Sequence, residues 1–227
     1  KYMKYTTLLF DLDETLMDFK KAEDNAISLF FRKYGIDPNA ENKSLYSEIN
    51  KSKWKVLERG EITRSQLFLS RFEELFNIFG IVADAAAAND EYLSFMAEGR
   101  FVFEGAEEIC RELSKNYKLY IITNGSKKAQ DGRLKNLPLI ESFEDVFISE
   151  EIGFDKPYKE FFDYVFEHIG EKDKSKCLVI GDSLTSDIAG AVNYEIDSCW
   201  LNPGEYRESP ATYQIKKLDE LFGILNI

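Results

Sequence analysis

Four carboxylates of this sequence stand where two short apolar runs end. Asp11 and Asp13 follow the run at residues 7–10, and Asp182, with Asp187 beyond it, follows the run at residues 178–180. If these carboxylates converge, the site is untenable without a counter-charge. Lys156 supplies only one positive charge, so a bound divalent cation is the economical solution. Oxygen ligands favour Mg²⁺, which often shares its coordination with a substrate phosphate, and the pattern therefore indicates a site for a phosphoryl group.

The apolar runs themselves predict a parallel sheet. Runs rich in β-branched and aromatic residues occur at residues 7–10, 118–122, 146–148, 178–180 and 198–201. Their near-continuous apolar character is typical of strands that are buried on both faces, and helical patterns alternate with them. We predict an α/β fold with a doubly wound, Rossmann-like parallel sheet. In such a sheet the residues that follow the strands meet in one crevice. The apolar spacing from Ile215 to Leu225 predicts a final amphipathic helix.

A stretch near the N-terminus breaks this alternation, because all its periodic patterns are helical. Four amphipathic helices are expected within residues 19–98, and Thr63 fits the N-cap of the third. We therefore predict an inserted all-helical cap domain at 19–98. The Rossmann-like catalytic core is then formed by residues 1–18 and 99–227.

Composition excludes several function classes. The net charge of −12 repels a phosphodiester backbone, so a nucleic acid polymer is not an expected partner. The sequence has no apolar run of 18 residues, which argues against a membrane span. Three cysteines without CxxC spacing suit reduced core thiols, and we expect a cytoplasmic protein. The single histidine, His168, excludes Ser-His-Asp hydrolases and His-rich metal hydrolases.

Each motif is uninformative alone, because an Asp-x-Asp is usually a turn and Lys-Pro pairs are common. Their conjunction, in one order and after predicted strands, is what carries information. Phe10-Asp11-Leu12-Asp13-Glu14-Thr15 resembles the first motif of the haloacid dehalogenase superfamily. The other three motifs of that superfamily are matched by Thr123-Asn124, Lys156-Pro157 and Gly181-Asp182 with Asp187. Glu14 is a departure, since glycine is more usual there.

The resemblance implies a mechanism for the acidic residues. Asp11 would attack phosphorus and form an aspartyl-phosphate. Asp13 would protonate the leaving oxygen and then activate the water. The metal, Mg²⁺, would be held by Asp11, Asp182 and the backbone carbonyl of Asp13. Asp187 would orient the site through water or Lys156.

The resemblance also implies how the phosphate is held. Thr123 would offer its hydroxyl, Asn124 a backbone N–H or its amide, and Lys156 its charge. Ser183 is a weaker candidate for a supporting role around the metal. In the cap, Trp54 and Phe68 are candidates for substrate contact, although aromatic residues at helical spacing usually pack a core.

Cap and loop residues narrow the resemblance further. They resemble a bacterial branch of pyrimidine 5′-nucleotidases through the segments Asn50-Lys51 with Trp54, Gly60-Glu61-Ile62-Thr63, Ile121-Ile122-Thr123-Asn124-Gly125, Ile148-Ser149-Glu150-Glu151-Ile152-Gly153 and Cys199-Trp200-Leu201-Asn202. The partner is then a small phosphorylated metabolite, a nucleoside monophosphate. A phosphatase of sugar phosphates or other small phosphometabolites is the alternative.

Other readings fit less well. A receiver-like phospho-signalling domain would carry its acceptor aspartate after a middle strand and would have no cap. A non-catalytic binding protein has no need of all the reactive residues. A mutase of the same superfamily is conceivable, whereas a carbon–halogen hydrolase needs neither a metal nor a second aspartate, so Asp13 and Asp182 disfavour it.

Overall fold

The structure, a computed structural model, describes residues 4–226 of the chain. Within these residues six strands form one parallel sheet in the order β3-β2-β1-β4-β5-β6. The strands are β1 (Thr7–Phe10), β2 (Lys118–Thr123), β3 (Asp145–Ile148), β4 (Cys177–Gly181), β5 (Asp197–Leu201) and β6 (Tyr213–Ile215). The chain proceeds outward from β1 to β3 and then returns to the other side of β1 at β4. The doubly wound α/β fold predicted from the apolar runs is confirmed.

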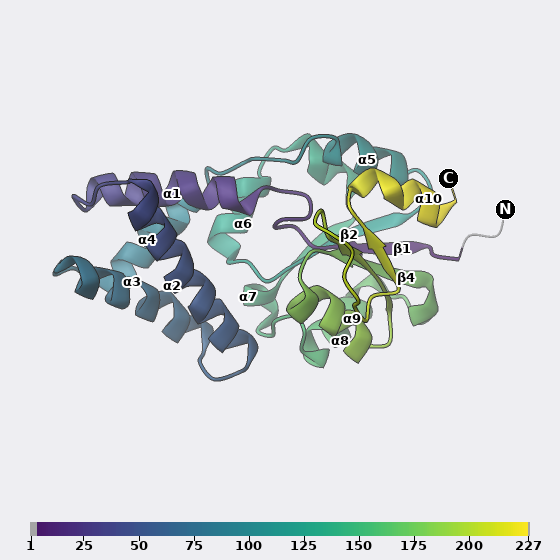
Figure 1. Cartoon of the computed structure of the whole chain (residues 1–227). Coiled ribbons are helices and arrows are strands. Elements are labelled where there is room, and N and C mark those ends of the chain that lie inside the picture. The colour runs from purple at the N-terminus through teal and green to yellow at the C-terminus, as the bar shows by residue number, and fades with distance from the viewer. Residues whose placement is uncertain (1–3, 227) are drawn as a thin grey trace. The chain divides into compact units, whose positions relative to one another are not determined.

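Helices cover both faces of this sheet (Figure 1). One face packs against α5 (Ala106–Leu113) and α10 (Leu221–Leu225), and the other against α8 (Lys159–Ile169) and α9 (Ala189–Asn193). Alternate residues of β1 point to opposite sides: Leu8 and Phe10 join the first core, and Leu9 joins the second. This explains why the central strand is apolar throughout rather than alternating. The remaining short helices and turns are α7 (Ser149–Ile152), η1 (Pro138–Ser142), η2 (Lys174–Lys176), η3 (Leu184–Ile188) and η4 (Leu218–Glu220).

The C-terminal segment differs from its prediction in one respect. Ile215 ends the edge strand β6, where it pairs with Leu201, and does not begin the final helix. The apolar spacing of Ile215 and Leu218 mimics one helical turn, but a β-branched residue beside an open sheet edge is also favoured in a strand. Helical structure starts at Leu218.

The chain divides into two compact units. We call them the core unit, comprising residues up to Asp18, Phe101–Lys127 and Leu134 onward, and the helical unit, comprising Phe19–Arg100 and Lys128–Arg133. The helical unit contains α1 (Phe19–Lys33), α2 (Ala40–Glu58), α3 (Arg64–Phe79), α4 (Ala85–Met96) and most of α6 (Lys127–Leu134). The sequence prediction placed the cap at 19–98, and the structure adds the α6 segment to the same unit. That this unit acts as a cap stays a prediction.

The helical unit is held by aromatic packing and by a buried polar network. Rings such as Phe30, Phe72 and Tyr92 contact one another in its interior. Thr63 accepts a hydrogen bond from the backbone N–H of Gln66 and caps α3, as its position before the apolar pattern predicted. Within residues 4–226, no helix combines the length and apolar character needed to cross a membrane.

Candidate active site

The strand register brings the predicted site residues to one edge of the sheet. Phe10 of β1 pairs with Ile121 of β2 on one side and Ile180 of β4 on the other, so the three strands end at the same level. Asp11 and Asp182 follow the two strands that flank the reversal of strand order. In open α/β sheets this reversal point is where ligands bind, and the acidic residues therefore occupy the expected crevice.

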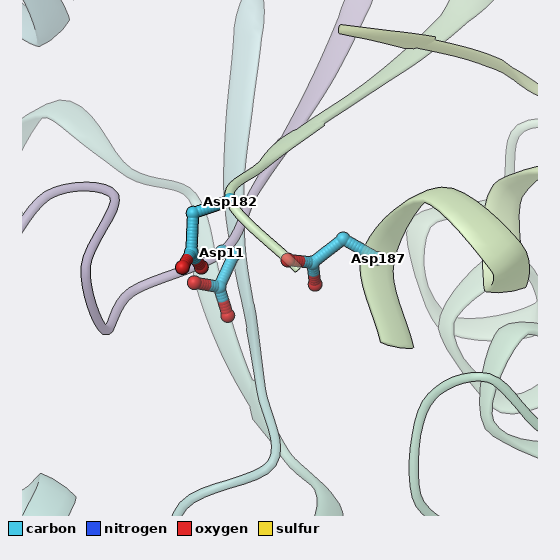
Figure 2. A group of neighbouring side chains, drawn as sticks. All are labelled: Asp11, Asp182 and Asp187. Carbon is cyan, nitrogen blue, oxygen red and sulfur yellow. The ribbon is translucent and has the colours of Figure 1, made fainter. Parts of the chain in front are cut away.

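Three carboxyl groups converge there. Asp11, Asp182 and Asp187 each have a carboxylate oxygen within 4.8 Å of the others, and Figure 2 shows the three groups turned toward one another. Asp11 and Asp187 are buried, while Asp182 is half-buried. The side chain of Asp13 is outside this cluster among the described residues, and the sequence analysis assigned its metal contact to the backbone carbonyl instead.

Asp11 is oriented through both of its carboxylate oxygens. Lys156 Nζ donates to Oδ1 over 2.7 Å, and the Thr15 hydroxyl donates to Oδ2 over 3.1 Å. The two donors lie 4 and 145 residues after Asp11 in the sequence, one in the turn after β1 and the other in the loop after α7. They leave the carboxylate with a defined direction, which is what a nucleophile at a phosphorus atom requires.

Lys156 is the buried counter-charge of the site, with a side chain only 1% exposed. Its ammonium donates to Asp11 Oδ1, to Asp187 Oδ1 and to the Ile122 carbonyl, each over 2.7 Å. Burial lowers the pKa of Lys156, but the Asp11 and Asp187 carboxylates outweigh burial and raise the pKa above its usual value. The lysine is therefore charged at neutral pH.

The carboxylates are not balanced by this one lysine. Burial raises the pKa of Asp11 well above its ordinary value, Asp187 adds to the rise, and Lys156 opposes it. Burial, Asp187 and Glu14 raise the pKa of Asp182 to about 7. Three carboxylates against one ammonium leave an excess of two negative charges. A divalent cation removes that excess, and clustered carboxylate oxygens are the ligands Mg²⁺ prefers, so these residues fit a magnesium ion.

Asp187 accepts hydrogen bonds at both of its carboxylate oxygens. Its Oδ1 accepts from Lys156, and its Oδ2 accepts from the backbone N–H of Ser183 over 3.1 Å. Its carboxylate also occupies the space where a side chain at Gly181 would start, because a Cβ at Gly181 would lie 2.2 Å from Oδ2. Glycine is required at position 181 so that Asp187 can approach the strand end. Ser183 also caps the next turn, since its hydroxyl accepts from the Ser186 N–H.

The turn after β1 has an unusual backbone conformation. Glu14 lies in the left-handed region with a φ of 62°. Glycine enters this region without strain, which explains physically why glycine is the more usual residue there. Asp13, beside it, is half-buried and forms an isolated bridge with Met17.

Thr123 and Asn124 end β2 beside the cluster. Thr123 is buried, and its hydroxyl accepts from the backbone N–H of Gly125. The Asn124 amide contacts the main chain of Lys156 at two atoms. Asn124 is expected to contact phosphate through its backbone N–H or its amide, and the amide is engaged in this other contact.

The two aromatic candidates of the helical unit are half-buried on α2 and α3. The Arg64 guanidinium lies 5.3 Å from the centre of the Trp54 ring and 5.9 Å from that of Phe68. Arg71 also lies on α3, and its guanidinium is 5.2 Å from the centre of the Phe68 ring. Both rings therefore already carry cationic partners within their own unit.

Two contacts escaped sequence reasoning. Thr15 lies four residues after Asp11 in the quoted motif, but its bond to that carboxylate was not foreseen. The Trp200 indole N–H donates to the backbone carbonyl of Asp182 over 2.7 Å. Trp200 is on β5, the strand beside β4, so only the strand pairing reveals its contact with the acidic loop.

The sequence of this chain also matches a known protein family. Residues 5–194 match the family model described as haloacid dehalogenase-like hydrolase. The chain belongs to this family. It is therefore a hydrolase, and the family match removes the receiver-like alternative.

Relatives within the family align along nearly the whole chain. The HAD-hydrolase YfnB of Bacillus subtilis is 41% identical over 99% of this chain and 97% of its own length. The pyrimidine 5′-nucleotidase PynA of Streptococcus pneumoniae is 36% identical over 99% and 96% of the two chains. The pyrimidine 5′-nucleotidase YjjG of Escherichia coli is 34% identical over 98% and 99%.

Solved structures agree on the fold. The crystal structure of YfnB bound to magnesium has a TM-score of 0.92 and covers 99% of this chain and 100% of its own. That structure is described as revealing interdomain movement in YfnB. The L-2-haloacid dehalogenase of Xanthobacter autotrophicus has a TM-score of 0.76 at 16% identity, with 98% of each chain covered, and shows a common fold.

Proposed function

We propose that this protein is a Mg²⁺-dependent phosphomonoester hydrolase that forms an aspartyl-phosphate on Asp11 and acts on nucleoside monophosphates. The observation that carries the proposal is the Asp11 carboxylate, held between Lys156 and Thr15 with Asp182 and Asp187 beside it. The site has one oriented carboxylate, one buried ammonium and an excess of negative charge that a divalent cation would neutralise. These features match the needs of phosphoryl transfer, in which positioning and charge stabilisation dominate.

Asp11 is the proposed nucleophile. Its oxygen forms a bond to phosphorus while the bond from phosphorus to the ester oxygen breaks. In the second step a water oxygen bonds to phosphorus, and the Asp11–phosphorus bond breaks. Asp13 gives its proton to the leaving ester oxygen in the first step and takes a proton from the water in the second.

The transferred group is held by residues from the other strand ends. Lys156 places its ammonium 2.7 Å from Asp11 Oδ1, and we assign it the stabilisation of the negative charge on the phosphoryl oxygens. Thr123 stands at the end of β2, and we assign it a contact to a phosphate oxygen. Asp11, Asp182 and the backbone carbonyl of Asp13 would hold Mg²⁺. When bound, the ion neutralises charge on the phosphate.

The proposed substrate class rests on two relatives. PynA and YjjG, at 36% and 34% identity over nearly the full chain, are both named pyrimidine 5′-nucleotidases. We propose a pyrimidine nucleoside 5′-monophosphate as the substrate, with Trp54 and Phe68 as contacts of the helical unit to it. The glyceraldehyde 3-phosphate phosphatase of Pyrococcus furiosus, 28% identical over 96% of this chain, favours a sugar phosphate as the second candidate.

We also propose a cytoplasmic location. Cys110, Cys177 and Cys199 are all buried and unpaired. Unpaired thiols are typical of proteins kept in a reducing compartment. The substrate class fits the same compartment, since phosphorylated metabolites are kept inside cells.

Hydrolysis of p-nitrophenyl phosphate tests the reaction class. Turnover should need Mg²⁺ and should stop in EDTA, because the three carboxylates then have only Lys156 to offset them. Full turnover in EDTA would contradict the metal assignment. Asp182→Asn should raise the Mg²⁺ concentration needed for half-maximal activity, while Asp24→Asn, at an exposed ion pair with Lys43, should not.

A panel of phosphorylated substrates tests the proposed substrate class. We expect kcat/KM to be highest for pyrimidine nucleoside monophosphates, lower for purine nucleoside monophosphates and lowest for hexose and triose phosphates. A panel in which sugar phosphates rank first would retain the phosphatase and replace its substrate class.

A further inference from the structure

Lys156 comes from a loop, yet its side chain occupies one buried position. It lies beyond the short helix α7, and no strand carries it to the site. A lysine side chain has four rotatable bonds and ends in a compact charge that can bond in many directions. Something must therefore fix the main chain of Lys156 before its ammonium can meet Asp11 at 2.7 Å.

The Asn124 side chain provides that connection. Its Nδ2 donates to the Lys156 carbonyl over 2.8 Å, and its Oδ1 accepts from the Lys156 N–H over 2.8 Å. Two such bonds to one residue are the pattern that a neighbouring strand makes in a sheet ladder. Here an amide takes the place of a strand.

The far end of the same lysine is held from the same strand. The ammonium of Lys156 donates to the carbonyl of Ile122, which lies two residues before Asn124 at the end of β2. Residues at the end of β2 and just after it thus bond to both the main chain and the ammonium of Lys156. The amide presents its donor and its acceptor on two separate atoms, whereas an ionised aspartate has no donor, alanine has neither group, and serine has both on one oxygen of shorter reach.

We propose that Asn124 is a positioning residue whose effect on phosphate binding and turnover passes through Lys156. The amide locks the Lys156 main chain, and Lys156 then presents its ammonium to Asp11 and to the phosphate. This inference rests on the proposed phosphatase function, and it replaces the direct contact between the Asn124 amide and phosphate that the family resemblance implied.

A double-mutant cycle on phosphate binding separates the two roles. The probe is inorganic phosphate, titrated by calorimetry into the Mg²⁺-loaded full chain. We expect Asn124→Ala to weaken binding by about tenfold, the usual effect of losing well-formed hydrogen bonds. Lys156→Met should weaken it by about a hundredfold, because a charge-assisted contact is lost.

The double variant decides the proposal. If Asn124 acts through Lys156, Asn124→Ala adds nothing once Lys156 is methionine, and the double variant binds phosphate as Lys156→Met does. If the amide touches phosphate itself, or merely supports the fold, its loss persists in the Lys156→Met background. Independent, multiplicative losses would overturn the proposal.

Two further variants serve as controls, one for loss of folding and one for the removal of an amide elsewhere in the chain. Asn124→Ser, a milder change for folding, should show the same dependence on Lys156. Asn39→Ala removes an amide that bonds the Asn42 N–H and Asp37 at the exposed start of α2, and it should leave phosphate binding unchanged. Because the cycle measures binding, it is interpretable even if p-nitrophenyl phosphate is not turned over, an outcome that would count against the proposed function alone.

Discussion

Charged groups are buried in both units, but they are arranged in opposite ways. In the network that joins α1 to α4 of the helical unit, one acid and one base are linked by amides: Arg71 donates to Asn50 over 3.0 Å and to Asn89 over 2.5 Å, and Asn50 donates to Glu23 over 2.8 Å. Each of the four residues belongs to a different one of the helices α1 to α4. In the core unit one lysine contacts the carboxylates of Asp11 and Asp187, and a third carboxylate, that of Asp182, lies in the same cluster.

The difference separates a structural network from a reactive one. In the network of Glu23, Asn50, Arg71 and Asn89 the charges are balanced, and the Asn50 amide bonds to both charged groups. In the core unit the charges are unbalanced, and burial together with the neighbouring Asp187 and Glu14 raises the pKa of Asp182 to about 7. A balanced buried network stabilises one packing of the helices, whereas an unbalanced cluster is a place where a cation and a phosphate can bind.

The largest effect is expected from Asp11→Asn. Turnover of p-nitrophenyl phosphate should fall by about 10⁴-fold or more, the order seen when one member of a catalytic group is removed. The melting temperature should hold or rise, because one of three crowded carboxylates becomes neutral. A marked loss of thermal stability would show that the cluster is a structural network after all.

The second prediction concerns the balanced network. Arg71→Met removes the buried cation that the Asn50 amide links to Glu23, and it should lower the free energy of unfolding by about 3–5 kcal/mol, the usual cost of losing one partner of a buried charge pair. Urea unfolding measures this, and Arg64→Met is the matched control, because its cation is half-buried over Trp54 and Phe68 and should matter by less than about 1 kcal/mol. Adding Glu23→Gln to Arg71→Met should recover part of the loss. A loss as small as that of the control would remove the contrast between the units.

A third effect should be smaller and confined to the metal. Trp200→Phe removes the N–H that donates to the Asp182 carbonyl but keeps a ring at that place. The Mg²⁺ concentration for half-maximal activity should rise by about tenfold, as for other partners that hold a ligand in place, while kcat at saturating Mg²⁺ changes little. Trp54→Phe is the control on the helical unit. An unchanged Mg²⁺ requirement would mean that the loop after β4 holds its shape without the indole.

The smallest effect is a pH dependence of stability. Burial raises the pKa of Glu23 above its ordinary 4.5, while Asn50, Ser47, Lys51 and Arg71 lower it. A raised folded pKa means that the unfolded chain releases the proton first, so stability is full below about pH 4.5 and declines as the pH rises through the folded value. Glu23→Gln should remove this part of the decline.

Urea unfolding of both proteins between about pH 4 and 7 measures the difference. Groups of the core unit contribute equally to the two pH profiles and cancel. Tyr46 and Tyr92, which also face Glu23, stay neutral in this range because burial raises the pKa of each. Parallel profiles would mean that Glu23 has an ordinary pKa in the folded protein.

The fold and the convergence of Asp11, Asp182 and Asp187 could be predicted from the sequence because both leave local marks. Buried parallel strands are continuous apolar runs, and Asp11, Asp182 and Lys156 are residue types that rarely stand at such positions without a reason. Partners across the sheet leave no such mark. The contact of Asn124 spans 32 residues of sequence, and that of Trp200 depends on the pairing of β4 with β5.

The α6 segment was missed for a related reason. Its buried residues include Gln130 and Arg133, which are polar, so no apolar periodicity marks a helix that packs against others. Arg133 donates there through Nε to the Gly99 carbonyl and through Nη1 to Gln130. Hydrogen bonds replace apolar contacts in this packing, and a hydrophobicity pattern does not record them.

The α6 segment determines which residues must be exchanged together when the helical unit is transferred between related proteins. A Cβ at Gly132 would lie 2.4 Å from the side chain of Ala97, and Arg100 donates to the Gly132 carbonyl over 3.1 Å, so the two stretches of the helical unit are fitted to each other. If residues 19–100 alone were moved into another member of the family, the Gly99 carbonyl would lose its hydrogen bond from Arg133. Ala97 would then pack against the corresponding helix of the host protein, which has a different sequence. The exchangeable module is a discontinuous one, and its second stretch stands just after the motif Thr123-Asn124 of the catalytic sequence.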